Sequence, residues 1–345
     1  MRWHFSGETY KHMRSQISSF LIALSIAFST LAPAQAQQAI SGGTTAAGKR
    51  PRVGLALGGG GARGAAHVSV LKELERQGVP IDLIVGTSIG SVVGGQYAAG
   101  VSLDELEREF LSTSLMHSFM TVPLWVRVAV APVMVLPRLF GSHPFDGLYK
   151  GNKFRNYLVK EVPSSEKNIE DLKIPFAAVG VNLLDGKVQR ISKGNLGFAM
   201  QASCAVPGLR KPVQIGDKLF CDGGVSQNVP VQLCREMGAD IVIAVNIDEP
   251  LLQEPIDKFR KVGSVSERLI KLQLHDVDAP QVASADLVIH PNTDGISLIS
   301  TKKSDAEKGL KAGREAAIAA MPAIRKKLAE NGIPLSSVAS KGIPH

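Results

Sequence analysis

Short apolar runs alternate with amphipathic stretches over the first part of the chain. Val53–Leu57 is apolar apart from one glycine, and His67–Glu75 carries its apolar residues at helical spacing. A second pair follows, in which Ile81–Val85 suits a strand and Ser91–Ala98 suits a closely packed helix. This alternation of strand and helix is typical of a parallel sheet with helices on its faces.

Later segments extend the pattern, with strand-like runs at Pro175–Asn182, Ile241–Asn246 and Asp286–His290. Asp305–Glu330 is rich in Ala, Lys, Glu and Leu, which predicts a helix that is broken near Pro322. With 345 residues, 44% of them hydrophobic and 20% charged, the chain can bury one large core. The sequence therefore predicts an α/β fold, a three-layer α/β/α sandwich with a mainly parallel central sheet.

The first 36 residues have the pattern of a secretory signal. Three basic residues and one acidic residue precede the uncharged apolar stretch Ile17–Ala32, and Ala34–Ala36 offers a small-residue cleavage site. We expect cleavage after Ala36 and export of the protein to the periplasm or beyond; an uncleaved membrane anchor is the alternative. Residues 37–51 are small and polar and are expected to form a flexible lead-in.

A run of glycines, Gly58–Gly61, joins the first predicted strand to the first predicted helix. Consecutive glycines let backbone N–H groups converge on an anion, to which the helix dipole adds. A nucleotide phosphate, a dinucleotide pyrophosphate, an acyl-transfer oxyanion and a purely structural turn are the four interpretations. A P-loop would end in Lys-Ser or Lys-Thr where this chain has Arg63-Gly64. Asp82 lies at the start of a strand, whereas the ribose-binding acid of a dinucleotide site lies at its end.

The segment Gly86–Gly90 places a serine at a turn from strand to helix. A serine in this position adopts a strained backbone conformation that only small flanking residues permit, and its hydroxyl is lifted clear of the sheet. The helix N-terminus also favours negative charge. Ser88 is therefore a candidate nucleophile, although the short pattern alone has little specificity.

Three motifs in this order resemble those of the patatin-like phospholipases, a family of serine acyl hydrolases. Gly59–Gly64 matches the family's Gly-Gly-Gly-x-Arg-Gly loop, Gly86–Gly90 its Gly-x-Ser-x-Gly turn, and Asp222–Gly224 its Asp-Gly-Gly. The resemblance spans residues 52–247 and continues more loosely to residue 320. Three ordered motifs are far more specific than any one of them.

The resemblance implies a Ser-Asp dyad, with Ser88 as nucleophile and Asp222 as general base, and it implies no metal and no cofactor. Arg63 is expected to fix the loop or to add positive potential. The resemblance places the family's oxyanion hole on Gly59, Gly60, Gly61, Ala62 and Arg63. It places the nucleophile elbow on Gly86 and Gly90, and the glycines of the Asp-Gly-Gly motif on Gly223 and Gly224.

A conventional Ser-His-Asp triad is the alternative within enzymes. Ser88, then Asp222 or Asp240, and then His275 or His290 would follow the chain order of an α/β-hydrolase. His67 lies one turn into a predicted helix and is expected to pack or to cap.

The resemblance implies hydrolysis of phospholipid or lysophospholipid acyl esters through an acyl-enzyme. The alternatives are a carboxylesterase or thioesterase acting on smaller acyl substrates, and a catalytically idle lipid-binding envelope protein. We expect a catalytic domain over 52–247, a C-terminal helical extension packed on the same core over 248–332, and a tail over 333–345. We expect no nucleic-acid partner, and the sequence leaves the oligomeric state open.

The formal net charge of +8 favours anionic surfaces, which suits peripheral association with a membrane. The apolar segment Met120–Phe140 suits either a lid at an interface or a buried insert. Arg210 and Lys211 suggest the hypothesis that the site prefers anionic headgroups.

Three cysteines, Cys204, Cys221 and Cys234, are present in a chain that we expect to be exported. At most one disulfide can form within the chain, and a Cys204–Cys221 pair is conceivable. Buried free thiols are the more ordinary interpretation, and the cysteine spacings do not suggest zinc.

Overall fold

The computed structural model describes residues 50–122, 126, 145–261 and 264–335. The predicted signal lies outside the described residues. The same is true of most of the lead-in, most of Met120–Phe140 and most of the tail. The chain divides into two compact units, and the larger comprises residues 50–253 together with the chain from residue 271 onward. The described part of the other unit, residues 254–270, contains the 3-10 helix Ile256–Arg260 and the first turns of a longer helix.

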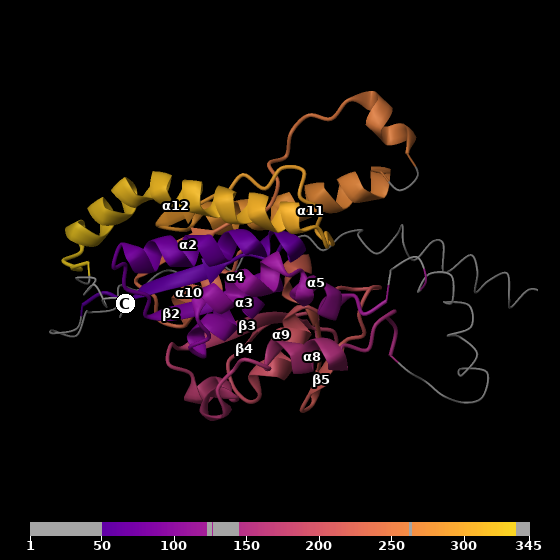
Figure 1. The fold of residues 1–345 in the computed structure, drawn as a ribbon, viewed down its shortest axis with the longest axis horizontal. Helices are drawn as coiled ribbons and strands as arrows, with labels where there is room; N and C mark the ends of the chain where they lie inside the picture. Colours follow the sequence, from indigo (N-terminus) through magenta and orange to yellow (C-terminus); the bar gives the residue numbers. More distant parts are fainter. Residues whose placement is uncertain (1–49, 123–125, 127–144, 262–263, 336–345) are drawn as a thin grey trace, which may run out of the picture. The chain divides into compact units, whose positions relative to one another are not determined.

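A mixed sheet forms the centre of the larger unit (Figure 1), with the strand order β5-β6-β3-β2-β1-β7-β8 and β4 beside β3. Its parallel part consists of β1 (Val53–Leu57), β2 (Leu83–Thr87), β3 (Phe176–Asn182), β7 (Ile241–Val245) and β8 (Leu287–Ile289). Antiparallel pairing adds β4 (Val188–Ile191), β5 (Val213–Ile215) and β6 (Lys218–Asp222). The predicted α/β fold with a mainly parallel sheet is confirmed, and the antiparallel edge is an addition to it.

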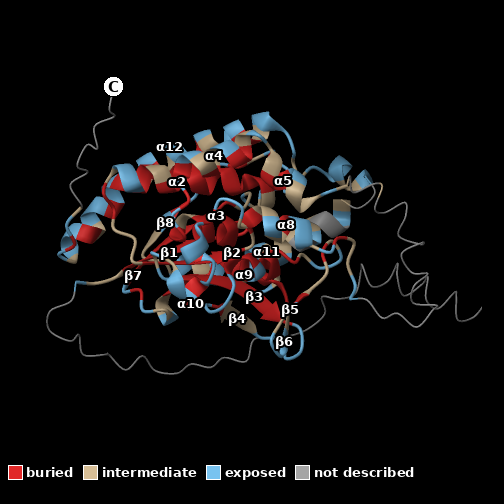
Figure 2. Ribbon diagram, turned by 60° about the horizontal axis from the view of Figure 1, so that its bottom comes forward, coloured by how far each residue is buried: buried red, intermediate tan, exposed pale blue. Residues whose placement is uncertain are grey.

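Helices cover both faces of this sheet (Figure 2). The helices after β1 and β2 are α2 (Ala65–Arg76), α3 (Ile89–Ala98), α4 (Leu103–Leu111) and α5 (Ser114–Phe119). The later helices are α8 (Asn152–Leu158), α9 (Leu196–Ser203), α10 (Val231–Glu236), α11 (Ser264–Ala283) and α12 (Lys303–Glu330).

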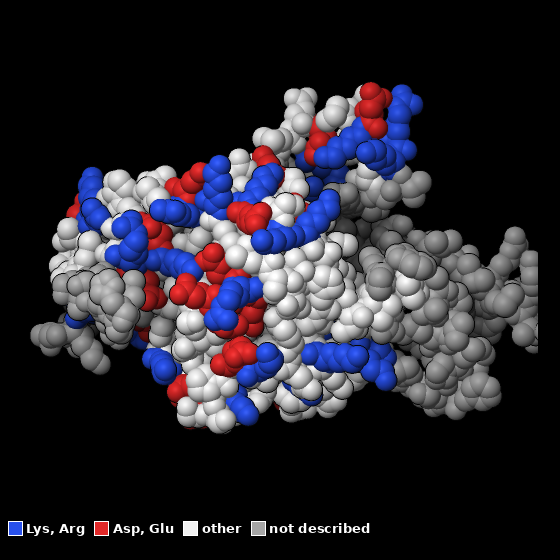
Figure 3. All heavy atoms as spheres, in the orientation of Figure 1, with Lys and Arg blue, Asp and Glu red and all other residues white. Residues whose placement is uncertain are grey.

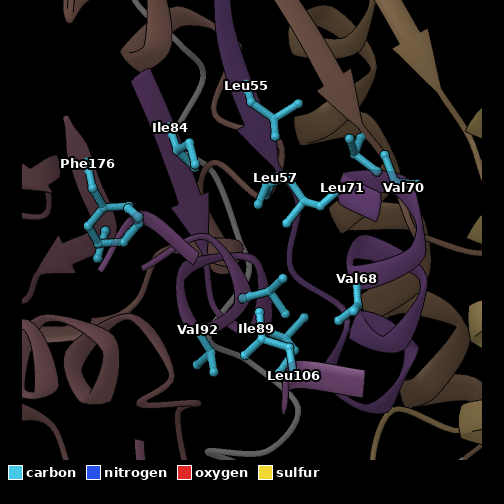
Figure 4. Packing of buried hydrophobic residues seen from close by; sticks show 14 of the residues in the cluster. Leu55, Leu57, Val68, Val70, Leu71, Ile84, Ile89, Val92, Leu106 and Phe176 are labelled. Carbon is cyan, nitrogen blue, oxygen red and sulfur yellow. The ribbon is translucent and has the colours of Figure 1, made fainter. Parts of the chain in front are cut away.

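Alternate residues of β1 face the two sides, as the two-residue period of a strand requires. Leu55 and Leu57 join the core that α2, α3, α4, α9 and α12 cover, whereas Ala56 joins a second core with α10. Figure 4 shows Leu55 and Leu57 among the side chains of Leu71 and Val68, both from α2. Fully burying one such leucine contributes about 2 kcal/mol.

The predicted strand Ile81–Val85 is shifted, because the pairing in the sheet runs from Leu83 to Thr87. Asp82 lies before the strand instead of within it. Its carboxylate accepts the Val53 N–H at 2.7 Å and forms an ion pair with Arg50. This side chain therefore fastens the strand's entry, and the strand continues two residues further toward the candidate nucleophile.

Helix α12 packs along α2 through small residues (Figure 1). A Cβ added at Gly313 would lie 2.2 Å from the Ala66 carbonyl oxygen, so the two helices approach closely. The predicted break near Pro322 is wrong, because α12 is continuous from Lys303 to Glu330. Pro322 is exposed and removes one backbone hydrogen bond, while the buried Met321 and Ile324 hold both sides of it in the core.

Candidate active site

Ser88 lies between β2 and α3 in a conformation that non-glycine residues rarely adopt, with φ 51° and ψ −122°. The turn is closed tightly. A Cβ added at Gly86 would lie 2.4 Å from the Gly90 carbonyl oxygen, and one at Gly90 would lie 2.3 Å from that of Leu57. Both glycines are therefore required by close backbone approach, as the sequence predicted for this elbow. The Ser88 side chain remains partly accessible.

The backbone around Ser88 is fixed by two other serines. Its N–H donates to Ser203 Oγ at 2.9 Å, and its carbonyl accepts from Ser91 Oγ at 2.6 Å. These bonds hold the strained turn on α9 and α3, so the hydroxyl starts from one defined position.

The glycine loop after β1 brings its backbone close to other parts of the unit. Gly60 and Gly61 have positive φ, at 153° and 56°. An added Cβ would lie 2.8 Å from Ile247 Cδ1 at Gly60 and 2.1 Å from the Leu298 carbonyl oxygen at Gly61. Only glycine fits both the conformation and the space at these two positions.

The hydrogen bonds of this loop narrow the set of predicted oxyanion donors. The N–H of Gly59 donates to Asn228 Oδ1 at 3.0 Å, that of Ala62 to the Leu298 carbonyl at 2.9 Å, and that of Arg63 to the Gly60 carbonyl at 3.2 Å. Their amides are therefore committed within the protein, so of the five loop residues that the resemblance assigns to the oxyanion hole these three hold the loop in shape. Within the described residues, the partly exposed Gly60 and Gly61 are the loop positions whose amides have no partner.

The side chain of Arg63 holds the glycine loop in place. Its side chain is 5% exposed, its Nε donates to the Ile296 carbonyl at 2.9 Å, and its Nη2 lies 2.7 Å from a carboxylate oxygen of Glu249. The guanidinium is thus occupied by the protein itself, in line with the first of its two predicted roles.

Asp222 ends β6, two strands from Ser88. Thr87 pairs with Val179 on β3, and the adjacent Gly180 pairs with Asp222 across the antiparallel edge. The Asp222 side chain is 5% exposed, and one carboxylate oxygen accepts the Gly224 N–H at 2.8 Å. A Cβ added at Gly223 would lie 2.7 Å from the Val179 carbonyl oxygen, so this turn also needs a glycine.

The structure brings Ser88 and Asp222 together. Burial raises the pKa of Asp222 to about 6, against the lowering effects of the Gly224 N–H and of hydrogen bonding to the Ser88 side chain. A carboxyl with this pKa is ionised at neutral pH, yet it is more basic than an ordinary aspartate. The pair has the arrangement of a nucleophile and its general base.

Cys204 lies beside the same pair, where burial, followed by the charge of Asp222, raises the pKa of its thiol. The described residues include all three cysteines, and each is free and buried. The ordinary interpretation of buried thiols therefore holds, and Cys204 packs against the site as a neutral group.

The histidines are engaged elsewhere in the described structure. His67 is fully buried with Nε2 2.8 Å from the Gly58 carbonyl oxygen, and burial lowers its pKa to about 4. It therefore packs as a neutral ring that donates to the start of the loop. His290 Nε2 lies 3.0 Å from the Asp248 carbonyl oxygen, and the exposed His275 lies beside Asp276. None of the described hydrogen bonds links a histidine to Ser88, which favours the dyad over the triad.

Arg210 does not present its charge as hypothesised. The side chain is 3% exposed, its Nη1 donates to the Phe119 carbonyl at 2.7 Å, and its guanidinium lies 4.6 Å from the ring centres of both Phe119 and Phe154. The hypothesis that Arg210 recognises headgroups is therefore wrong, because its guanidinium is buried and already makes cation–π contacts with two phenylalanine rings.

The sequence pattern did not predict Asn228, because no periodicity or spacing marks it. It follows the Asp222–Gly224 motif and holds the Gly59 N–H at 3.0 Å. Only the folded chain brings it to the loop, 169 residues away in sequence.

The fold and site define a class of protein, an α/β protein with a serine elbow facing a buried aspartate and a glycine loop. A family model described as patatin-like phospholipase matches residues 55–235, more than half of the chain. The chain belongs to the patatin-like phospholipase family.

Relatives share this part of the chain. An uncharacterized NTE family protein of Mycobacterium tuberculosis is 35% identical over 198 residues, which cover 57% of this chain and 49% of the relative. The lysophospholipase NTE1 of Debaryomyces hansenii is 36% identical over 198 residues, which cover 56% of this chain and 12% of that protein. The chain thus spans about half the length of the first of these relatives and far less of the second.

Among solved structures, VipD from Legionella pneumophila matches 79% of this chain and 67% of its own, at 14% identity and a TM-score of 0.42. That likeness is too distant to add to the assignment, which follows from the sequence matches.

Proposed function

We propose that this protein is a serine acyl hydrolase in which Ser88 is the nucleophile and Asp222 the general base. The observation that carries the proposal is the contact between the strained, partly accessible Ser88 and the buried carboxyl of Asp222. Membership of the patatin-like family supports the same chemistry.

The reaction begins when Asp222 accepts the Ser88 hydroxyl proton and the serine oxygen attacks the ester carbonyl carbon. The carbonyl π electrons move to its oxygen, which the N–H groups of Gly60 and Gly61 stabilise. Each such donor contributes about 3 kcal/mol in serine hydrolases. When the tetrahedral intermediate collapses, the ester C–O bond breaks, Asp222 returns the proton to the leaving alcohol, and the acyl group stays on Ser88.

Water then completes the turnover. Asp222 takes a proton from a water molecule, which attacks the acyl-serine carbonyl, and the proton passes to the departing Ser88 oxygen. The position of Ser88 at the N-terminus of α3 favours the developing negative charge in both steps.

The substrate class that we propose is a phospholipid or lysophospholipid acyl ester. The family description and the name of the fungal lysophospholipase support it. A carboxylesterase or thioesterase on smaller acyl groups remains the second candidate, and parallel assays on lysophosphatidylcholine and on a short-chain nitrophenyl ester separate the two.

Fluorophosphonate labelling of the purified protein, followed by mass spectrometry, tests the dyad. We expect labelling at Ser88, its complete loss in Ser88→Ala, and a fall of about a hundredfold or more in the labelling rate of Asp222→Asn. Asp240→Asn is the matched control, because Asp240 accepts the Arg52 N–H at 2.7 Å and was a candidate acid of a triad. Equal labelling of Asp222→Asn and the parent protein would exclude Asp222 as the base.

We also propose that the protein is exported and acts peripherally at a membrane surface. The signal-like first 36 residues support export, and the chain without them keeps a net charge of +6, the full +8 less the +2 of the signal, which supports association with anionic surfaces. On the face in Figure 3, however, Lys and Arg are interspersed with Asp and Glu, so no single-sign patch dominates that face. Mass spectrometry of the protein recovered from the periplasm should give an N-terminus at Gln37, and a retained Met1 would contradict cleavage.

A further inference from the structure

Asn228 connects the glycine loop to two buried acids. Its Oδ1 accepts the Gly59 N–H at 3.0 Å, and its Nδ2 donates to Asp248 Oδ2 at 2.8 Å. Its own backbone N–H donates to Asp278 Oδ1 at 3.0 Å, and the Val229 N–H donates to the same oxygen at 3.1 Å. The Asn228 side chain therefore joins Gly59 to Asp248, and its backbone holds Asp278.

The two acids face each other. Asp278 is 3% exposed, and its Oδ2 is buried without a hydrogen-bond partner among the described residues. Asp248 is the neighbouring acid whose charge acts on it. Two carboxylates this close cannot both be ionised in a buried setting at moderate cost. One proton shared between them gives the orphaned oxygen a partner and removes the repulsion.

The direction of the Asn228 side chain depends on this pair. An acceptor at Asp248 requires the Nδ2 group, so the carbonyl oxygen must point to Gly59. The reverse orientation would set the Nδ2 donors of Asn228 against the Gly59 N–H and leave its carbonyl oxygen facing the Asp248 carboxylate. The acid pair thereby decides which atom of Asn228 meets the loop.

We propose that Asn228, Asp248 and Asp278 are positioning residues for the oxyanion loop, and that a proton shared by the two acids keeps Gly59 anchored while the amides of Gly60 and Gly61 point free. The proposal rests on the proposed acyl-transfer function. It also makes the anchoring of Gly59 depend on pH, because loss of the shared proton leaves two negative charges that repel each other next to Asn228.

The charged or titratable groups that face the pair are Arg63, from the loop itself, and His290, after β8. Arg63 is already paired with Glu249 at 2.7 Å. Burial and then the Asp248 charge raise the pKa of Asp278 to about 7, and burial raises that of Asp248. The tether is therefore complete in mildly acidic and neutral solution and weakens as pH rises past the titration of the pair.

Three variants test the proposal on a soluble ester substrate. Asn228→Ala should lower kcat by about ten- to a hundredfold with little change in KM, because a displaced loop affects the transition state more than the bound substrate. Asp278→Asn supplies a permanent N–H toward Asp248, so it should stay active and lack the alkaline decline in kcat that the proposal predicts for the parent protein. Gln281→Ala is the control, because Gln281 lies one turn further on α11 and bonds Gln227 and Gln232 instead.

Amide hydrogen exchange of the peptide that contains Gly59 gives a readout that needs no catalysis. After correction for the intrinsic effect of pH, protection should fall in Asn228→Ala at every pH, fall in the parent protein only at alkaline pH, and persist in Asp278→Asn. Gln281→Ala should match the parent.

Unchanged protection and unchanged kcat in Asn228→Ala would overturn the inference, as would an alkaline decline that survives in Asp278→Asn. If the parent protein neither hydrolyses esters nor reacts with fluorophosphonate, the proposed function fails, and the exchange data still decide whether the acids hold the loop. The two failures are therefore distinguishable.

Discussion

Burial of a single carboxyl determines how the proposed dyad works. Asp222 lies almost out of reach of water but keeps the Gly224 N–H and the Ser88 side chain as partners. Desolvation makes it a better proton acceptor, and the two partners keep it ionised at neutral pH. A more exposed aspartate would be too weak a base, and a fully unpartnered one would stay protonated.

The activity should therefore decline on the acid side of pH 6. With the pKa of Asp222 raised to about 6, protonation removes the base, and kcat/KM should fall about tenfold per pH unit below that value. A pH–rate profile on a soluble ester checks this. A profile that stays flat down to the ordinary aspartate range, near 3.8, would contradict the assignment.

The same burial should cost stability. Because the folded pKa of Asp222 exceeds the unfolded value of 3.8, the stability that this carboxyl permits is fully present below 3.8 and is lost as pH rises through about 6. Asp222→Asn keeps an acceptor for the Gly224 N–H and cannot ionise. Thermal unfolding should show it more stable by up to about 3 kcal/mol at neutral pH and above, but no more stable at acid pH. Equal stabilisation at both pH values would point to another cause.

At the scale of elements, the site depends on backbones that approach too closely for side chains. The elbow between β2 and α3 packs Gly90 against the carbonyl of Leu57, so the turn carrying Ser88 and the strand before the glycine loop are in direct contact. This contact sets the distance between the nucleophile and the amides of Gly60 and Gly61.

Gly90→Ala should abolish fluorophosphonate labelling, because a Cβ 2.3 Å from the Leu57 oxygen must push the elbow away from the loop. Gly186→Ala is the matched control. Its φ of 70° makes the substitution cost about 1 kcal/mol, but nothing lies within 4 Å of the added carbon. Labelling of Gly90→Ala at the parent rate would show that the elbow tolerates displacement.

Local sequence patterns predict some elements well. Val53–Leu57 and the helix around His67–Glu75 were identified from apolar periodicity, because both bury one or two complete faces. None of the strands β4, β5 and β6 is among the predicted strand-like runs, because they lie toward a sheet edge and carry few consecutive apolar residues. A proline predicts a helix break only when the surroundings permit one, and at Pro322 the core on both sides does not.

At the scale of the whole molecule, α12 closes one face of the sandwich. Its residues Ala306, Ala317 and Ile324 belong to the same core as β1 and β2, and Gly309 and Gly313 bring it against α2. The catalytic elements and this C-terminal helix therefore share one hydrophobic interior.

Gly313→Val should destabilise the unit by several kcal/mol, on the order of other overpacked cores, because its Cβ would lie 2.2 Å from the Ala66 carbonyl oxygen. Denaturant unfolding measures the effect. Ala319→Val, on the exposed side of the same helix, should change stability by about 0.5 kcal/mol or less. Similar values for the two variants would mean that α12 is not part of the shared core.

The candidate site could be predicted from the sequence only where a motif is continuous. Ser88, Asp222 and the glycines each stand in a short recognisable segment, and the structure brings those segments together. The residues proposed to hold the glycine loop, Asn228, Asp248 and Asp278, do not stand in a recognisable segment. They are single polar residues, and only tertiary packing brings them together. The burial of Arg210 was hidden for the same reason, since nothing local distinguishes it from a solvated cation.

The pairing of β6 with β3 determines when the catalytic pair is complete during folding. Ser88 and Asp222 lie far apart in the sequence. Asp222 comes close to Ser88 only when β6, which lies late in the sequence, pairs antiparallel with β3. Contacts between such distant segments form slowly compared with local ones, because the entropy of closing the intervening loop opposes them. A polypeptide in which β6 has not yet paired with β3 therefore carries the serine without its base. We therefore expect hydrolytic competence to appear only when the chain has folded through β6.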